Sequence, residues 1–138
     1  MSEEIRDKVD FNGMLTVMLM IVAVMFLASG YAWLLLPDDI QVPLHWGIDG
    51  QPDRWGDKTE GLLVMPVIAL VTVVMFRLVP VIEPRKRNLL QSSNAYVVVG
   101  TTVVAFMAAL HLLMLGNLME LIVIGIGSAV PFLVAVRP

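Results

Sequence analysis

Residues 14–36 read MLTVMLMIVAVMFLASGYAWLLL, and this stretch indicates the class of protein. It contains no charged side chain and lies between Asp10 and the acidic pair Asp38-Asp39. A helix needs about 20 mostly apolar residues to cross the hydrocarbon core of a bilayer, which is about 30 Å thick. The stretch therefore predicts a membrane-spanning helix. Ala28-Ser29-Gly30 is typical of a signal-peptide cleavage site, but the preceding leader is acidic, so we expect the helix to be retained.

Three further apolar stretches follow the first, at residues 62–79, 96–115 and 118–136. The last two are separated only by the short polar joint Gly116-Asn117. Four spans with short connections predict an all-α fold, an antiparallel four-helix bundle in the membrane. In this interpretation residues 1–13 form a leader, and residues 14–138 form a single membrane domain.

The composition excludes several classes of protein. Of the 138 residues, 58% are hydrophobic and 15% are charged, and the mean hydropathy is +0.83. A soluble globular domain is about 45–50% apolar and about 25% charged, so this class is excluded. The sequence has no Cys, which removes disulfides and thiol catalysis, and a net charge of −3 argues against binding to nucleic acid. It shows no nucleophile–base–acid set and no phosphate loop, so we do not expect an enzyme.

The distribution of Lys and Arg predicts the orientation. The connection after the second span contains three consecutive basic residues, Arg85-Lys86-Arg87, and the leader contains Arg6 and Lys8. The connection after the first span is acidic. Because cytoplasmic loops carry an excess of Lys and Arg, we expect a multi-pass protein of the cytoplasmic (inner) membrane with both termini cytoplasmic and residues 37–61 outside.

Residues 37–61 form the longest connection, and its composition predicts order. Apolar side chains interleave with polar ones, and Asp49-Gly50 and Pro52-Asp53 are turn signals. A connection of this length inside a compact chain is commonly functional. We therefore expect an ordered extracellular cap on the outer mouth of the bundle, with Trp46 and Trp55 at the level of the lipid headgroups.

Two motifs in this order resemble the SdpI-like family of membrane immunity proteins. The first motif is carried by residues of the cap: Leu36-Pro37, Ile40, Pro43, His45-Trp46, Gly50, Pro52-Asp53 and Lys58. The second lies in the next connection: Glu83-Pro84-Arg85, Asn88, Ser92 and Tyr96. The resemblance covers roughly residues 14–100, the N-terminal module of that family, which is classed as a domain of unknown function. Fuller members carry further spans and a second polar motif.

The resemblance implies protection of a cell against a secreted, membrane-disrupting peptide toxin. We expect the cap to bind or antagonise such an extracellular peptide through six side chains: His45, Trp46, Asp49, Asp53, Trp55 and Lys58. The carboxylates could attract a cationic peptide, or they could simply form a solvated face. We expect Lys58 to pair with Asp53 or Asp57.

The alternative function is a membrane sensor that responds to a metal ion or a small ligand. His45, His111 and Glu120 are all expected near the outer mouth, and two imidazoles with a carboxylate suit a divalent metal such as zinc. The competing interpretation of His45 is a histidine that organises the loop by a hydrogen bond to a carbonyl or an Asp. The competing interpretation of His111 is a hydrogen bond within the bundle or to Asn117 or Glu120.

On the cytoplasmic side, the predicted contact residues are Arg85, Lys86, Arg87 and Asn88. Their positive charges favour anionic lipid, and in some relatives this side holds a transcriptional repressor. Two pairs of small residues at four-residue spacing, Ala28/Ala32 and Gly125/Ala129, favour close helix packing within the chain, with a homodimer face as the alternative.

Overall fold

The computed structural model describes residues 11–82 and 92–135, with side chains described as far as Glu120. Its elements are helix α2 (Phe11–Leu35), strands β1 (Val42–Trp46) and β2 (Pro52–Gly56), helix α3 (Lys58–Ile82) and helix α5 (Ser93–Ala135). Three helical segments are long and apolar enough to cross a membrane: Phe11–Leu35, Lys58–Pro80 and Ser93–Glu120. The prediction of membrane-spanning helices at these three places agrees with the structure.

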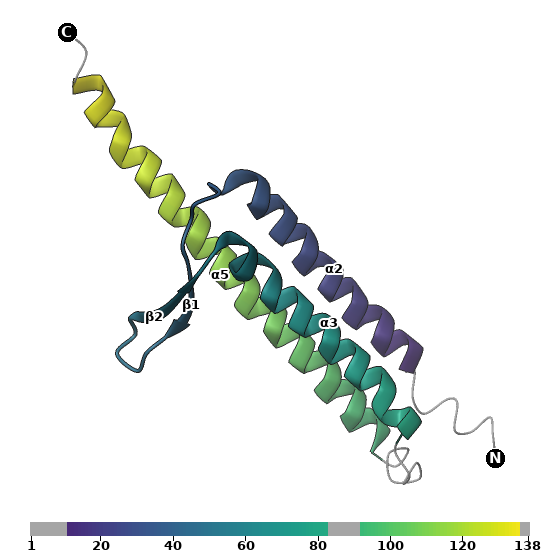
Figure 1. Cartoon of the computed structure of the whole chain (residues 1–138). Coiled ribbons are helices and arrows are strands. Elements are labelled where there is room, and N and C mark those ends of the chain that lie inside the picture. The colour runs from purple at the N-terminus through teal and green to yellow at the C-terminus, as the bar shows by residue number, and fades with distance from the viewer. Residues whose placement is uncertain (1–10, 83–91, 136–138) are drawn as a thin grey trace, which may run out of the picture.

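The three helices lie side by side, with α3 antiparallel to α2 and α5 (Figure 1). The two strands form a hairpin that joins α2 to α3 at one end of the bundle and projects to one side of it (Figure 1). The beginnings of α2 and α5 and the end of α3 lie at the opposite end. The bundle thus has a hairpin end and a non-hairpin end.

The structure does not show the predicted four-helix bundle. The stretches 96–115 and 118–136 belong to one helix, α5, which continues through Gly116-Asn117 and extends beyond the hairpin (Figure 1). Glycine and asparagine weaken a helix by about 1 kcal/mol or less each, so this pair permits a turn without enforcing one. The start of α2 and the end of α5 consequently lie at opposite ends, whereas four spans would return the chain to its first side. The fold is mostly helical, as predicted, but residues 37–61 add a two-stranded sheet.

The helices pack along one stripe of α2. Its buried residues recur every three or four positions: Met14, Met18, Val22, Met25, Ser29 and Ala32. The first four join Ala69 and Val73 of α3 and Val104 and Ala108 of α5 in one apolar cluster. The unbranched side chains of Met14, Met18 and Met25 therefore fill the core. A second cluster at the hairpin end joins Ala32, Leu62 and Leu115 of the helices to Val42 of β1.

Candidate functional site

The hairpin is a pair of short antiparallel strands with a glycine-containing turn. Val42 pairs with Gly56 and Trp46 with Pro52, with register irregularities between these ends. In the turn, Gly50 has a φ of 74°, a left-handed conformation that glycine adopts without a steric cost. The predicted Asp49-Gly50 turn is therefore confirmed. Pro52 and Asp53 instead lie in β2, so the turn predicted there is wrong.

Close contact with α3 holds the root of the hairpin. Val42 is fully buried, and its side-chain atoms would lie only 2.6–2.7 Å from a Cβ built on Gly61, in the first turn of α3. Only a residue without a side chain leaves room for this approach. Gly61 therefore positions β1 against the helix, and the apolar cluster around Val42 attaches the hairpin to the bundle.

Lys58, at the start of α3, is hydrogen-bonded to the residues that directly follow α2. Its Nζ donates to the carbonyl oxygen of Leu36 and to Asp38 Oδ1, both at 2.8 Å, and it lies 5.0 Å from the centre of the Trp33 ring. The residue is buried, whereas the side chain of Asp38 is 98% exposed. A cation beside the last carbonyls of a helix is favourable because it complements the helix dipole. The predicted pairing of Lys58 with Asp53 or Asp57 is thus wrong, since neighbours in sequence were assumed to be neighbours in space.

The Lys58 contact predicts a defined acid sensitivity. The hydrogen bond and the charge of Lys58 lower the pKa of Asp38 below its ordinary 3.8. A lowered pKa adds stability above the ordinary value, and this contribution disappears as the pH falls through the folded-state pKa. Thermal unfolding of the wild type and of Asp38→Asn in the same detergent should therefore differ by a constant amount between about pH 5 and pH 7 and converge below about pH 4. A difference that instead grows as the solution is acidified would contradict the Lys58–Asp38 contact.

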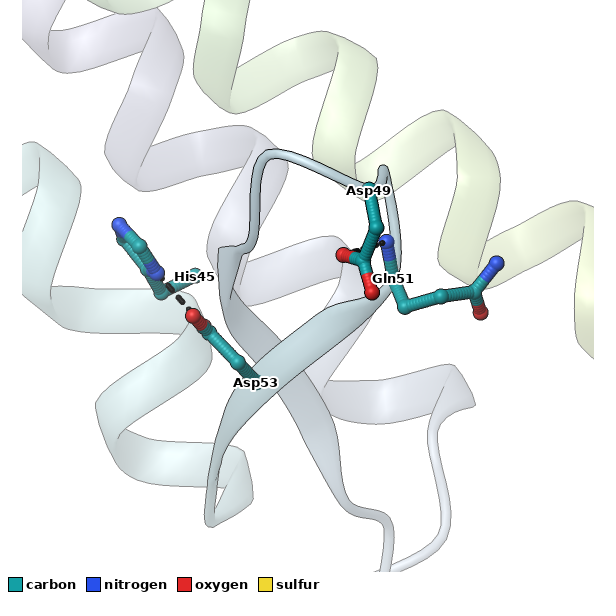
Figure 2. A network of polar contacts seen from close by, with 4 residues as sticks. All are labelled: His45, Asp49, Gln51 and Asp53. Carbon is teal, nitrogen blue, oxygen red and sulfur yellow. Dashed lines mark hydrogen bonds and ion pairs between the residues drawn. The ribbon is translucent and has the colours of Figure 1, made fainter.

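Five of the predicted binding residues lie on the hairpin, namely His45, Trp46, Asp49, Asp53 and Trp55, and Figure 2 shows four polar side chains of this segment. His45 Nδ1 and Asp53 Oδ1 lie 2.6 Å apart and link the two strands. In the turn, the backbone N–H of Gln51 donates to Asp49 Oδ1 at 3.1 Å. Of the two interpretations of His45, this geometry matches the loop-organising histidine. Trp46 and Trp55 are about half exposed, and Ile48 at the tip is fully exposed.

The hairpin segment keeps a surplus of exposed carboxylates. Its two cations are already paired, Arg54 with Glu60 and Lys58 with Asp38. Four further aspartates are exposed and have no Lys or Arg partner among the described residues: Asp39, Asp49, Asp53 and Asp57. This end of the molecule therefore presents negative charge beside exposed indole rings.

Two cavities flank the hairpin, each of about 440 Å³, within the size range of small-molecule sites. The hairpin groove lies between the strands and α5, and its walls include Pro43, Trp46, Trp55 and Leu118. The second cavity is the α3–α5 cleft. It is lined by apolar residues of both helices, with Arg54, Glu60 and Asn117 as its polar groups. Trp46 and Asn117 border both cavities.

His111 forms a polar contact that joins all three helices. Ser29 Oγ of α2 donates to the carbonyl oxygen of Leu62 in α3 at 2.7 Å and lies 2.8 Å from His111 Nε2 of α5. Because a hydroxyl has one proton, Ser29 accepts its second bond from His111 Nε2–H. The Nδ1 atom of His111 is buried without a partner in the described part of the chain. We call Ser29, the Leu62 carbonyl and His111 the Ser29 node.

Pro66 explains why the Leu62 carbonyl is free to accept this bond. In a regular helix the N–H of residue 66 would donate to the carbonyl of residue 62, but proline has no N–H. The same arrangement recurs at the other end of α3, where Pro80 frees the Phe76 carbonyl and Tyr96 Oη donates to it at 2.7 Å. The sequence signal for the first contact is a proline inside the predicted span 62–79, and for the second it is a proline directly after that span.

The predicted metal ligands do not converge. His111 is buried in the Ser29 node, His45 is exposed on the hairpin, and Glu120 is exposed on α5. Within residues 11–82 and 92–120, no three His, Asp or Glu side chains form a group that could hold a metal ion. The interpretation of His111 as hydrogen-bonded within the bundle is confirmed by its contact with Ser29. The alternative partners Asn117 and Glu120 lie further along the same continuous helix. The predicted cytoplasmic contacts Arg85, Lys86, Arg87 and Asn88 lie outside the described residues.

Residues 20–70 match the family model described as "Domain of unknown function (DUF1648)". This match extends over just over a third of the chain. It covers most of α2, the whole hairpin and the first half of α3, and so includes Ser29, Lys58, Gly61 and Pro66. No curated protein and no solved structure matched the chain.

Proposed function

We propose that this protein is a membrane-embedded binding module of the immunity type, similar to the SdpI-like proteins, which captures a cationic membrane-active peptide at the hairpin. The observation that carries the proposal is the seated hairpin. Its root is fixed by Val42, Gly61 and Lys58, while its outer surface exposes two tryptophans among four aspartates that have no Lys or Arg partner in the described part of the chain. A preorganised surface of this kind binds without the cost of ordering a loop.

The chemistry of the surface defines the peptide. The hairpin groove offers the faces of Trp46 and Trp55 to apolar side chains, and indole rings are favoured at the boundary between water and lipid. The exposed aspartates attract Lys and Arg side chains and raise the rate of encounter. A peptide with one apolar and one cationic face complements both features, and such peptides disrupt membranes when they are free.

The distribution of basic residues supports a hairpin that faces outward. The leader and the 83–91 connection, which adjoin the non-hairpin end, contain Arg6, Lys8 and the Arg85-Lys86-Arg87 run. The hairpin segment contains two basic residues, and both are paired. By the positive-inside rule the hairpin lies on the extracellular side of the cytoplasmic membrane, where it meets a secreted peptide before the peptide inserts.

Removal of the hairpin carboxylates should weaken peptide binding. With the full chain in phosphatidylcholine nanodiscs and a synthetic amphipathic Leu/Lys peptide as the probe, Asp49→Asn with Asp53→Asn should bind about tenfold more weakly at low salt. A pair of unit charges about 4 Å apart in water contributes about 1 kcal/mol. The loss should shrink as salt is added, because exposed charges are screened. Trp55→Phe, which keeps an aromatic wall, should bind nearly as the wild type does.

The cellular test uses variants that break the contact between His45 and Asp53. Deletion of the gene should sensitise the cell to a membrane-active cationic peptide, and the wild type should restore resistance where His45→Ala or Asp53→Ala does not. These two variants remove the 2.6 Å link between the strands. Equal sensitivity of the deletion strain and its parent across a broad peptide panel, together with unchanged binding by the Asn variants, would rule this function out.

A further inference from the structure

We propose that the α3–α5 cleft is a binding site for one zwitterionic phospholipid with a primary ammonium headgroup, a phosphatidylethanolamine. This site differs from the hairpin groove proposed for the peptide, since the two cavities share only Trp46 and Asn117 among their lining residues. Its failure would leave the peptide proposal standing.

The position of the cleft favours a lipid as its occupant. Its apolar walls come from Val64 and Met65 of α3 and from Leu110, Leu113 and Met114 of α5. All five residues lie within segments apolar and long enough to span the bilayer. Val64 lies only six residues, about 9 Å, from the start of α3, so the cleft lies in the outer part of the span. An acyl chain reaches this depth from the surrounding leaflet without crossing water.

The charges beside the cleft select the headgroup. Arg54 and Glu60 form an ion pair that borders the cavity, and their side chains are 64% and 34% exposed. The guanidinium can donate hydrogen bonds to a phosphate, and the neighbouring carboxylate can accept hydrogen bonds from a primary ammonium. A phosphatidylethanolamine headgroup carries both groups side by side. Phosphatidylcholine has a phosphate but a quaternary ammonium that cannot donate, and phosphatidylglycerol has no cation at all.

Competitive lipid retention tests the headgroup assignment. Native mass spectrometry of the full chain, released from detergent containing equal amounts of the three lipids, should show about fivefold more bound phosphatidylethanolamine than either competitor. Glu60→Gln should transfer the preference to phosphatidylglycerol, because Arg54 is then an unpaired cation. Equal retention of all three lipids by the wild type would overturn the proposal, since ordinary annular lipid behaves in that way.

Filling the cleft tests its location. Leu113→Trp places a larger side chain in the cavity and should reduce the retained phosphatidylethanolamine about fivefold. Leu112→Trp is the matched control, because this neighbouring exposed residue of α5 does not line the cleft, and it should retain lipid as the wild type does. Val64→Trp fills the same cleft from the α3 side and should also reduce the retained phosphatidylethanolamine. This second variant tests the proposal if Leu113→Trp fails to fold.

The same variants distinguish the proposed lipid from two other occupants of the cleft, the peptide and a second copy of the chain. If Leu113→Trp leaves lipid retention unchanged but abolishes binding of the Leu/Lys peptide, the cleft is part of the peptide site and the lipid assignment is wrong. If the variant converts a dimer into a monomer in mass spectra, the cleft holds a second copy of the chain, and the lipid assignment is equally wrong. Loss of lipid with peptide binding intact supports the proposal.

Discussion

Ser29→Ala should lower the free energy of unfolding by about 2 kcal/mol, although it removes a single oxygen atom. The variant leaves two buried groups without partners, the Leu62 carbonyl and His111 Nε2–H. A buried polar group without a partner costs about 1–3 kcal/mol, whereas polar bonds between membrane helices contribute about 0.6 kcal/mol on average. Because Leu62 and His111 are both fully buried, we expect a value well above that average.

Pro66 should control the size of this loss. In the Pro66→Ala background, the new N–H of residue 66 can donate to the Leu62 carbonyl. Ser29→Ala then leaves only the Nε2–H of His111 without a partner. The loss should fall to about half, which a double-mutant cycle in SDS titrations of the full chain would measure. Thr16→Val is the matched control, because its hydroxyl bonds only to Asn12 of its own helix and its loss should cost less than about 0.5 kcal/mol. Equal losses in the two backgrounds would show that Pro66 does not free the carbonyl that Ser29 uses.

Gly61→Ala should detach the hairpin while the three helices stay folded. A Cβ at residue 61 would lie within 2.7 Å of three atoms of Val42, so either β1 or the start of α3 must move. Overpacking of this kind costs about 1–3 kcal/mol, which outweighs the gain of about 1 kcal/mol from replacing glycine by alanine in a helix. Trypsin cleavage after the exposed Arg54 should rise about tenfold, the change that about 1.4 kcal/mol of local destabilisation produces.

Gly30→Ala provides the control for this prediction. A Cβ on Gly30 meets no atom within 4 Å, so the same substitution in α2 should leave the cleavage rate unchanged and raise stability by up to about 1 kcal/mol. Gly61→Ala should also weaken binding of the Leu/Lys peptide, because the tryptophans and aspartates are no longer held together. Unchanged proteolysis and peptide binding in Gly61→Ala would show that the contact with Val42 does not hold the hairpin.

Local features of the chain were predictable from its residues. Apolar length located three helices, because the cost of burying an unpaired backbone group in lipid requires a helix wherever such a stretch crosses. The Asp49-Gly50 turn was predictable because few residues besides glycine adopt a positive φ without strain. The polar, aromatic character of residues 37–61 indicated an ordered cap on the mouth of the bundle, but the segment forms a two-stranded hairpin that projects to one side of the bundle end. Pro43 obscured β1, since proline is disfavoured within sheets but tolerated in a hairpin whose strands are both edges.

The continuity of α5 was not predictable from the local pattern. Gly116-Asn117 is compatible both with a turn and with a helix, and the two differ by energies that packing against the other helices easily exceeds. This one difference changes four spans into three long helices. It also removes the predicted proximity of His111 to Glu120, and with it the geometric basis for a metal site.

Hydrogen bonds between residues that are distant along the chain were decided only by the packing of the helices. Lys58 bonds to Leu36 and Asp38 because the ends of α2 and α3 meet there, and Ser29 joins Leu62 and His111, which are 33 and 82 residues away. A sequence shows that Pro66 frees a carbonyl and that His111 needs a partner, since both are properties of single residues. Which hydroxyl satisfies both depends on the register of three helices, and that register is set by the sum of many weak contacts along the apolar stripe.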